Sequence, residues 1–571
     1  MSPPAVGRRV RRGRRAMVGF AGGVARNRVL ARGAAVCALG ALAGCGYLPG
    51  PGPGESGQAG ETTQASAGHD PRWVVTENAR DGASDWRIGD AQVAGDTQLA
   101  GYFGQVSVTP GEPATLYLTS TVGDVQITAY RLGWYAGRGA REVWASARPV
   151  AGSAQAPPEI ASDRTVTTRW KPSATIDTTG WPEGSYLFVL RADSTPGSGR
   201  QTGRGSGLGL GTAKYVPLVV RSASVRDRLV LSSPVTTYQA YNRWGGHSLY
   251  KGPDLSFRTR SSRVSFDRPY DRNGAMETFK FEVPIVSWAE RLGLDLAYTS
   301  AVDLEAHGDA LDGARGLVTM GHDEYWTVPE RHAVEAARGR GINLAFLGAN
   351  AAYWRIRLEP GVLGERRMIV GYKSAAADPV TGPQTTAMWR QMPHPRPENS
   401  LTGMLYECFP ARGPFVVHDP TFFLFEGTGA SAGRPYAGLV GSEIDRAYPL
   451  EGTPPSLQVV AHSPVTCANR GVTAADAVYY TDPSGAGVFS TGTMMWATAL
   501  AGTTGGASGL DGRSVSFARA VTDNLLTAMA AGPMGRKHPA HPNLAAVGAP
   551  ASTEHGTGGP VAGSDAGDAA H

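Results

Sequence analysis

The chain has 571 residues, enough for two or three domains. Hydrophobic residues make up 41% and charged residues 18%, as in an ordinary globular protein, while 76 glycines and 40 prolines indicate many turns. The net charge of +5 comes from the first 44 residues, which hold nine arginines and no acid. The rest of the chain has 45 basic and 49 acidic residues, so we expect no nucleic-acid partner.

The first 45 residues have the composition of an export signal. A long arginine-rich segment precedes the apolar run "GAAVCALGALAGC", which is too short to span a bilayer as a helix. The run ends in Leu42-Ala43-Gly44-Cys45, which resembles the lipobox at which bacteria attach lipid to the cysteine. We therefore predict a lipoprotein signal over 1–45, lipidation at Cys45, and an extracytoplasmic protein anchored to the cell membrane by this lipid. An uncleaved anchor is the alternative. Residues 46–70 are predicted to be a flexible linker.

Residues 71–225 are predicted to form a β-sandwich of immunoglobulin-like type. Five segments alternate or run apolar, with turn residues between them at short spacing: "QVSVTP", "ATLYLTS", "DVQITAYRLG", "SYLFVLRAD" and "AKYVPLVVR". Many short strands of this kind are typical of an antiparallel sandwich.

Residues 226–535 change to a mixed pattern that predicts an α/β domain. The run "LVTM" at 317–320 predicts a buried strand, Thr327 caps a helix from 328 to about 340, and "INLAFLG" predicts the next strand. Strand, helix and strand in this order form a βαβ unit, which implies a mainly parallel, doubly wound sheet. Residues 351–455 lack strong periodicity. By composition, 536–571 are predicted to be a disordered tail.

Two cysteines remain once Cys37 and Cys45 are assigned to the signal. Cys408 and Cys467 form an even pair in a chain that we predict to be exported, where disulfides persist. We predict that they are bridged, which is worth roughly 4 kcal/mol if loop closure acts through chain entropy. Two buried free thiols are the alternative.

Several common catalytic motifs are missing from the sequence. Neither Cys408 nor Cys467 lies in the glycine-rich elbow of a cysteine nucleophile. The one G-x-S-x-G spacing, around Ser431, is followed by no helical pattern. No strand is followed by a phosphate loop, and no H-E-x-x-H zinc motif occurs. Cysteine nucleophiles and zincins are therefore excluded, and a serine hydrolase is disfavoured.

Polar and aromatic residues gather instead in short segments that follow predicted strands. "VTTYQAYNRWGGHSLY" (235–250) follows one strand, "MGHDEYW" (320–326) follows another, and "LGAN" ends a third at Asn350. The carboxyl ends of parallel strands meet at one edge of a sheet, so we expect these segments to converge on one pocket. Phenolate and carboxylate are hard oxygen donors that suit a Lewis-acidic ion such as ferric iron.

A family resemblance is carried by six segments in order along the chain: "YRLGWYAGRGAR" (130–141), "TTYQAYNRWGGHSLY" (236–250), "SFDRPY" (265–270), "GHDEYW" (321–326), "LGANAAYWRIR" (347–357) and "GVFSTGTMMW" (487–496). Together they resemble the large, catalytic subunit of N,N-dimethylformamidase and its relatives, over roughly residues 110–530. The resemblance implies an α/β domain like that of class I glutamine amidotransferases. It also implies a mononuclear iron, held by two tyrosines and one glutamate, that hydrolyses amides without a cysteine or serine nucleophile.

Carried over residue by residue, the resemblance implies a ferric iron site made of Tyr241, Tyr270 and Glu324. Glu324 matches the carboxylate ligand. Tyr241 is our choice for the first phenolate, with Tyr238 as the alternative. Tyr270 is our choice for the second phenolate, although Tyr250 also lies nearby in the sequence.

Four residues are predicted to take part in catalysis around this ion: His322, Glu324, Asn350 and Lys373. His322 or Glu324 would assist proton movement. Asn350 would donate a hydrogen bond to the developing oxyanion, and Lys373 in "GYKS" matches a pocket lysine of the family.

These features predict an iron-dependent hydrolase of C–N amide bonds, similar to N,N-dimethylformamidase, that acts on a small-molecule or cell-envelope amide. A homo-oligomer or a small partner subunit fits the resemblance. The main alternative is a non-catalytic envelope binding protein that keeps the fold without metal. A third hypothesis is a glycosidase that pairs Glu324 with Asp323 or Glu359, although neighbours in sequence rarely face each other across a cleft.

Overall fold

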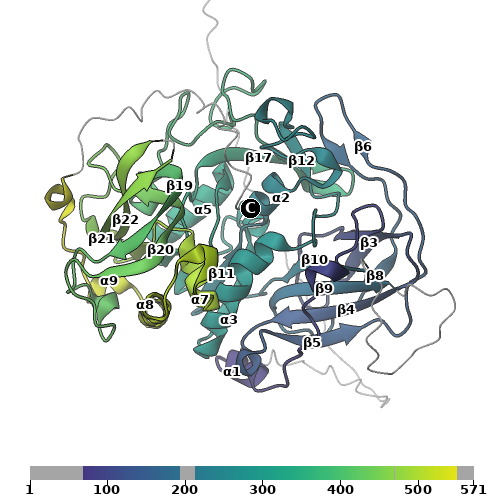
Figure 1. Ribbon diagram of the computed structural model, residues 1–571, viewed down its shortest axis with the longest axis horizontal. Helices are drawn as coiled ribbons and strands as arrows, with labels where there is room; N and C mark the ends of the chain where they lie inside the picture. Colours follow the sequence, from purple (N-terminus) through teal and green to yellow (C-terminus); the bar gives the residue numbers. More distant parts are fainter. Residues whose placement is uncertain (1–68, 193–211, 469, 549–571) are drawn as a thin grey trace, which may run out of the picture. The chain divides into compact units, whose positions relative to one another are not determined.

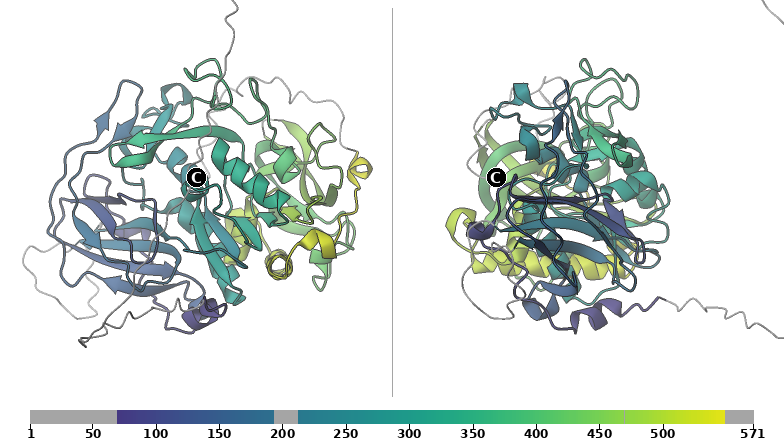
Figure 2. Two further views of the ribbon diagram at one scale, coloured as in Figure 1. Left: turned by 180° about the vertical axis from the view of Figure 1, so that it is seen from behind. Right: turned by 90° about the vertical axis from the view of Figure 1, so that its right-hand side faces the viewer.

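The computed structural model describes residues 69–192, 212–468 and 470–548 of the chain (Figures 1 and 2). The predicted export signal, with Cys45, and nearly all of the predicted linker lie outside these ranges. Within them, no helix has both the length and the apolar character needed to cross a bilayer.

Two β-sheets pack face to face in the first part of the described chain. Their strand orders are β1-β3-β8 and β2-β10-β9-β4-β5. The bounds are β1 (Leu99–Phe103), β2 (Ser107–Val108), β3 (Ala114–Ser120), β4 (Val125–Leu132), β5 (Ala140–Ala145), β8 (Ala174–Ile176), β9 (Gly184–Ala192) and β10 (Ala213–Val220). Leu116 of the first sheet shares one buried core with Ile127 and Phe188 of the second. The alternating pattern therefore predicts the sandwich correctly, and its immunoglobulin-like type stays a prediction.

A nine-stranded sheet, parallel in its first half, forms the second part. Its order is β13-β11-β14-β16-β23-β22-β21-β19-β20, and the first five strands run parallel. The bounds are β11 (Leu229–Ser233), β13 (Leu296–Ser300), β14 (Gly316–Thr319), β16 (Asn343–Phe346), β19 (Leu405–Val416), β20 (Pro435–Arg446), β21 (Gln458–Cys467), β22 (Gly471–Thr481) and β23 (Gly487–Ser490). Figure 1 shows the antiparallel extension in green on the left and the sandwich in blue on the right.

Helices cover both faces of the parallel half, as the predicted βαβ pattern requires. Leu229 and Leu231 of β11 share a core with α3 and α8, whereas Val230 shares the opposite core with α4 and α5. A strand buried on both faces is rich in consecutive apolar residues, as residues 229–231 are here. The helices are α1 (Trp73–Asn78), α2 (Val235–Tyr241), α3 (Val283–Arg291), α4 (Ala301–Ala306), α5 (Val328–Gly339), α6 (Asn399–Thr402), α7 (Met495–Ala501), α8 (Gly512–Ala530) and α9 (Met534–Lys537).

The order of the parallel strands marks a place for a ligand. In chain order the strands are β11, β13, β14, β16 and β23, but β13 lies on one side of β11 and β14 on the other. Doubly wound sheets bind ligands where the strand order reverses in this way, outside the carboxyl ends of the strands. Helix α2 follows β11, and the residues after β14 lead to β15 (Tyr325–Thr327). Two of the segments predicted to converge therefore start at this point.

The region 351–455, which lacks strong periodicity in the sequence, contains four well-formed strands. Two are β19 and β20 of the large sheet. The others, β17 (Trp354–Gly361) and β18 (Gly364–Val370), form a small sheet with β12 (Arg263–Ser265) and β15 in the order β12-β18-β17-β15.

The predicted disordered tail needs correction over residues 536–548. The His538 ring stacks on Phe423 with ring centroids 4.1 Å apart, and Asn543 accepts a hydrogen bond from the backbone N–H of Val459 at 2.6 Å. These contacts to distant parts of the chain hold the segment in place, and composition alone does not reveal them. The rest of the predicted tail, 549–571, lies outside the described residues.

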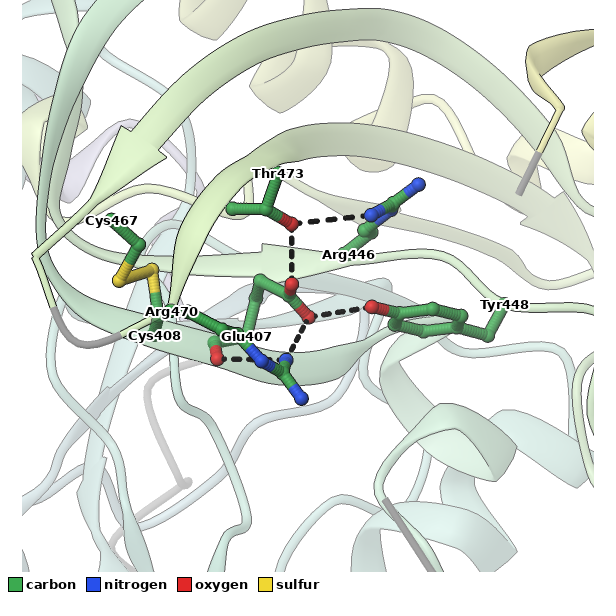
Figure 3. Close-up of a disulfide and its surroundings, with 7 residues drawn as sticks. All are labelled: Glu407, Cys408, Arg446, Tyr448, Cys467, Arg470 and Thr473. Atoms are coloured by element: carbon green, nitrogen blue, oxygen red, sulfur yellow. Dashed lines mark hydrogen bonds and ion pairs between the residues drawn. A yellow bond between two sulfur atoms is a disulfide. The ribbon is translucent and has the colours of Figure 1, made fainter. Parts of the chain in front are cut away.

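The predicted bridge between Cys408 and Cys467 is confirmed. It joins β19 to β21 with a Cα–Cα distance of 6.3 Å (Figure 3). Beside it, Glu407 accepts a hydrogen bond from the Tyr448 hydroxyl at 2.7 Å and forms an ion pair with Arg470 at 2.8 Å. The bridge and this polar group together fix the antiparallel end of the sheet.

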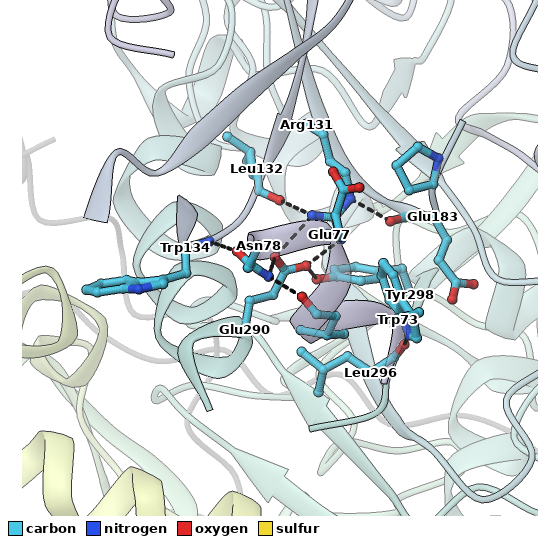
Figure 4. Close-up of polar contacts among 12 residues, drawn as sticks. Trp73, Glu77, Asn78, Arg131, Leu132, Trp134, Glu183, Glu290, Leu296 and Tyr298 are labelled. Atoms are coloured by element: carbon cyan, nitrogen blue, oxygen red, sulfur yellow. Dashed lines mark hydrogen bonds and ion pairs between the residues drawn. The ribbon is translucent and has the colours of Figure 1, made fainter. Parts of the chain in front are cut away.

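A buried ion pair joins the sandwich to the α/β part (Figure 4). Arg131 of β4 contacts both carboxylate oxygens of Glu290 on α3, with 3.0 Å between Nη1 and Oε2, and both side chains are fully buried. The Tyr298 hydroxyl donates to the same carboxylate at 2.5 Å. Arg131 also donates to the carbonyl oxygens of Leu132 and Glu183. Every charge in the pair is thus satisfied, as burial requires.

Replacing Arg131 with methionine should destabilise the fold strongly, because the Glu290 carboxylate would stay buried without its cation. We expect a loss of about 3–5 kcal/mol in the free energy of unfolding, measured from the urea midpoint at pH 7. Arg169→Met is the control, because it breaks the exposed pair with Glu159 and should cost less than about 1 kcal/mol. Similar midpoints for the two variants would contradict a structural role for Arg131.

Candidate active site

The turn after β14 depends on two glycines that let strand ends approach closely. Gly321 has a φ of 72°, and a side chain there would collide with the Phe281 ring. A Cβ at Gly348, which follows β16, would lie 1.8 Å from the carbonyl oxygen of Gly321. Only glycine fits both positions. The two glycines lie against each other beside the turn after β14, in which residues 322–324 are all buried.

Helix α2 is bonded directly to this turn. The Thr237 hydroxyl oxygen accepts hydrogen bonds from the backbone N–H groups of Glu324 and Tyr325, at 3.0 and 3.2 Å. The Thr236 hydroxyl donates to the carbonyl oxygen of Tyr325 at 2.8 Å. Tyr241 ends the same helix, so these bonds set its position relative to Glu324.

Two phenols meet one buried carboxylate at this edge of the sheet. The Tyr241 hydroxyl donates to Glu324 Oε2 and the Tyr250 hydroxyl donates to Oε1, each at 2.7 Å. Their rings stack with centroids 4.8 Å apart. Glu324 is 0% exposed. The structure therefore brings Tyr241 and Glu324 together, as the predicted site requires.

The second phenol that reaches Glu324 is that of Tyr250, whereas Tyr270, our choice for the second ligand, is placed elsewhere. Tyr270 lines a different cavity together with Tyr238, the alternative considered for Tyr241. Within the described parts of the chain, the hydroxyls that donate to Glu324 are those of Tyr241 and Tyr250, and neither Tyr238 nor Tyr270 donates to it.

The path of the chain after α2 explains the position of Tyr250. The backbone N–H of Leu249 donates to the carbonyl oxygen of Ala240 at 2.9 Å, so the chain returns along the end of the helix. This return puts Tyr250 against Tyr241. The indole N–H of Trp354 then donates to the Tyr250 hydroxyl oxygen at 3.2 Å.

His322 lies between Glu324 and a second carboxylate, Glu443. Its Nε2 is 3.3 Å from Glu324 Oε2 and 3.6 Å from Glu443 Oε2, although neither approach has hydrogen-bond geometry. Glu443 lies on β20, in the region without periodicity, so the sequence analysis did not identify it. The one available signal is that Glu443 and Asp445 are acids two residues apart on a strand, both facing the interior.

Asn350 orients the two acids of β20. It has a left-handed φ of 60°, which asparagine tolerates better than most residues. Its backbone N–H donates to Asp445 Oδ1 and its side-chain Nδ2 donates to Glu443 Oε2, both at 2.8 Å. Asn350 is thus placed to position Glu443, and its predicted role as a donor to an oxyanion stays a prediction.

Lys373 is buried among aromatic rings beside the two phenols. Its Nζ lies 3.0 Å from the ring centroid of Tyr250, 4.8 Å from that of Trp354 and 5.0 Å from that of Tyr325. Nζ has no hydrogen-bond partner among the described residues. Burial lowers the pKa of Lys373 well below its usual value, although Glu324 opposes the shift.

Burial and mutual charge set the protonation of the cluster. Burial raises the pKa values of Tyr241 and Tyr250, and the Glu324 carboxylate raises them further. Burial also acts to raise the pKa of Glu324, but His322 outweighs it and the pKa is lowered. The pKa of Glu443 is raised by burial and by Glu324, against the effect of His322. The neighbours of the two carboxylates thus shift their pKa values in opposite directions, down for Glu324 and up for Glu443.

The donor set fits a hard metal ion. Two phenolic oxygens, of Tyr241 and Tyr250, lie within hydrogen-bond distance of the Glu324 carboxylate, and these are the hard oxygen donors that ferric iron prefers. Several buried polar atoms nearby have no hydrogen-bond partner among the described residues, including His322 Nε2, Lys373 Nζ and Asn350 Oδ1. In the described ranges, no group of three or more His, Cys, Asp or Glu side chains is placed to hold a metal. An iron site therefore depends on the two phenols.

Glu359, one candidate partner of Glu324 in the glycosidase hypothesis, is engaged elsewhere. It lies on β17 and forms ion pairs with Arg263 and Arg357. Glu443, by contrast, lies close to Glu324, because both carboxylates are neighbours of His322.

Comparison with known proteins identifies a family. A family model described as N,N-dimethylformamidase beta subunit-like, C-terminal, matches residues 126–509, which include every residue of the cluster. The match confirms the resemblance of the six sequence segments. No curated protein matches the chain.

Among solved structures, one match is a cycloisomaltooligosaccharide glucanotransferase of Paenibacillus sp. complexed with cycloisomaltoheptaose. It shares 10% identity, with 57% of this chain and 62% of that chain covered and a TM-score of 0.17. The chain thus spans less than two thirds of the length of that protein, and a likeness this weak carries no argument about fold or function.

Asp445 should make stability depend on pH. Burial raises its pKa to about 7, the hydrogen bond from Asn350 opposes this shift, and Glu443 adds to it. An unfolded aspartate titrates near pH 4, so the folded chain holds one more proton between about pH 4 and 7. The contribution of Asp445 to stability therefore falls as the pH rises through that window, by up to about 1.4 kcal/mol per pH unit.

Asp445→Asn keeps the acceptor oxygen without the charge and tests this dependence. Its melting temperature should match that of the wild type near pH 4 and exceed it at pH 8. The surface variant Asp312→Asn is the control, with no such trend expected. A constant difference between Asp445→Asn and the wild type across pH 4 to 8 would show that Asp445 is ionised throughout.

Proposed function

The chain belongs to the N,N-dimethylformamidase beta subunit-like family, and we propose that it is an iron-dependent hydrolase of C–N amide bonds. The observation that carries the proposal is the buried cluster in which Tyr241 and Tyr250 each approach Glu324 at 2.7 Å. Two phenolates and one carboxylate would balance the charge of a ferric ion. Buried anionic oxygens at such close range otherwise repel one another strongly.

In this proposal Tyr241, Tyr250 and Glu324 hold the iron. The two phenolic protons that are directed at Glu324 would leave on binding, because metal ligands must be deprotonated. When bound, the ferric ion would act as a Lewis acid that polarises the amide carbonyl and lowers the pKa of water. The hydrogen bond from Trp354 would keep the Tyr250 oxygen in place.

Glu443 is the proposed proton acceptor. Amide hydrolysis adds water across the C–N bond, so one proton must leave the attacking water and one must reach the departing nitrogen. A carboxylate with a raised pKa suits both steps. Asn350 orients Glu443, and His322 stands between it and Glu324, where a positive charge would reduce the repulsion between the carboxylates.

The proposed location and substrate class rest on the sequence. The lipobox at 42–45 lies outside the described residues, and a disulfide between Cys408 and Cys467 fits a chain that is exported. We propose a small-molecule or cell-envelope amide, met outside the cytoplasm by a protein tethered through lipid on Cys45. A homo-oligomer or a small partner subunit is compatible with this proposal.

Iron content distinguishes the two candidate ligand sets. The wild-type protein should take up iron in near-stoichiometric amount and show a visible phenolate-to-iron absorption band. Tyr250→Phe should lose most of both signals, because it removes one of the phenolic oxygens. Tyr270→Phe is the matched control and should keep them. Loss of iron in Tyr270→Phe but not in Tyr250→Phe would overturn the assignment. A colourless wild type that takes up no iron would favour the non-catalytic envelope protein.

Glu443→Gln should separate proton transfer from metal binding. In a screen of simple amides, the variant should lose about 100-fold or more in kcat, which is typical of removing a general base. Its iron content and absorption band should be unchanged. Glu359→Gln, which alters a carboxylate outside the cluster, should keep the wild-type rate. Full activity in Glu443→Gln would show that another group accepts the proton.

A further inference from the structure

A cavity lies between the sandwich and the α/β part. About 590 Å³ of space between atoms belongs to it and to its opening, part of which is open solvent. Strands β1, β9 and β10 line it from the sandwich, and β11, α2 and the π-helical segment η5 (Thr278–Glu282) line it from the α/β part. Tyr270 belongs to this cavity. The cavity and the candidate active site are therefore built on the same helix, α2.

Glu282 is a carboxylate in the cavity wall that forms no ion pair with any side chain in the described residues. It is 3% exposed, and its oxygens accept hydrogen bonds from the hydroxyls of Ser233 and of Ser185, the latter at 3.0 Å. Burial raises the pKa of Glu282, and the groups that oppose this shift are hydroxyls, those of Ser233, Ser185 and Tyr238. A buried carboxylate satisfied only by neutral donors favours a cationic partner.

Aromatic side chains line the same space. Tyr238 is 5% exposed, and its hydroxyl lies close enough to Glu282 to lower the pKa of that carboxyl, although it meets no geometric hydrogen-bond criterion with any described residue. Five further rings line the cavity, those of Tyr102, Phe103, Tyr186, Phe266 and Tyr270. Aromatic rings combined with one carboxylate are the usual means of recognising an alkylammonium ion, because both the π-electrons and the charge attract it.

Two arginines also line the cavity, but both are engaged by other groups. Arg367 forms an ion pair with Asp267 at 2.7 Å. Arg268 donates to three backbone carbonyl oxygens, those of Asn242, Trp244 and His247. In the described part of the chain, neither arginine forms an ion pair with Glu282.

We propose that this cavity binds a small alkylammonium ion, with an N–H group that donates to Glu282 and alkyl groups that lie among the aromatic rings. Hydrolysis of an amide breaks the C–N bond, gives the carbonyl carbon an oxygen from water, and releases the nitrogen as an amine that takes up a proton in neutral water. The proposed reaction thus supplies this ligand as a product. That source rests on the proposed function, whereas binding in the cavity does not.

A ligand in the cavity would contact the two elements that support the candidate active site. On α2, Tyr238 lines the cavity while Tyr241 reaches Glu324. On η5, Glu282 lines the cavity while the Phe281 ring packs against His322, with centroids 6.1 Å apart. Single-turn π-helices of this kind are frequent at functional sites. An amine product bound in this cavity would therefore influence the positions of the Tyr241 and His322 side chains.

Calorimetric titration of the full chain with trimethylammonium chloride tests the proposal. The protein is treated with a chelator beforehand, so the result does not depend on iron or on activity. We expect saturable binding that sodium chloride at equal ionic strength does not reproduce. Neutral tert-butyl alcohol, which is similar in size, should bind at least about tenfold more weakly.

Two variants locate the binding. Glu282→Gln keeps the size of the side chain and should weaken binding at least about tenfold, because the charge is lost. Glu142→Gln, which changes an exposed acid on β5, should bind as the wild type does. The proposal would be overturned if the wild type bound no trimethylammonium, or if Glu282→Gln bound it equally well. It would also be overturned if glycine betaine bound more tightly than trimethylammonium, because the cavity would then be a site for a zwitterion.

A crystal of the wild-type protein soaked in trimethylammonium keeps the proposal testable if Glu282→Gln does not fold. Density for the ligand within hydrogen-bond distance of Glu282 would support it, and density only elsewhere would overturn it. An active amide hydrolase with an empty cavity would refute this inference alone. An iron-free, inactive protein that binds the ion at Glu282 would refute only the proposed function.

Discussion

The carboxylate of Glu324 is buried at the point where the strand order reverses. Such burial costs several kcal/mol unless neighbouring groups stabilise the negative charge. Tyr241 and Tyr250 donate to its two oxygens, and His322 lowers its pKa against the effect of burial. Each neighbour arrives from a different part of the fold: a helix after β11, the return of the chain beyond that helix, and the turn after β14. Two other features hold these segments in contact. Glycines let β14 and β16 end close together, and the threonines of α2 form hydrogen bonds with the turn after β14.

The sandwich contributes to the site although none of its residues enters the cluster. The buried pair of Arg131 and Glu290 fixes it against α3, which directly follows η5 along the chain. Helix α2 and segment η5 each contribute side chains both to the cluster around Glu324 and to the cavity that the sandwich lines on its other side. A shift of the sandwich would therefore change the support of Tyr241 and His322, which gives a physical reason for keeping the two parts in one chain.

Local signals explain which parts of the fold were predictable from the sequence. The helix 328–340 has a threonine cap, an acid three residues later and amphipathic spacing, and it forms as α5 with that capping box. The flanking buried strands and the disulfide also follow from local pattern or composition. Tyr250 was not predictable, because its position depends on how the chain folds back on α2. Glu443 was missed for a related reason: β20 lacks periodicity, and its partners His322 and Asn350 are distant in sequence. Residues 538–547 are held by contacts with distant parts of the chain, which composition cannot show.

The central claim is that two phenols and Glu324 form a metal site, and diffraction at the iron absorption edge tests it most directly. Crystals grown after loading with ferric iron should show an anomalous peak bounded by the hydroxyl oxygens of Tyr241 and Tyr250 and by the carboxylate of Glu324. A peak against Tyr270 instead, or iron-loaded crystals with no peak at this cluster, would contradict the account.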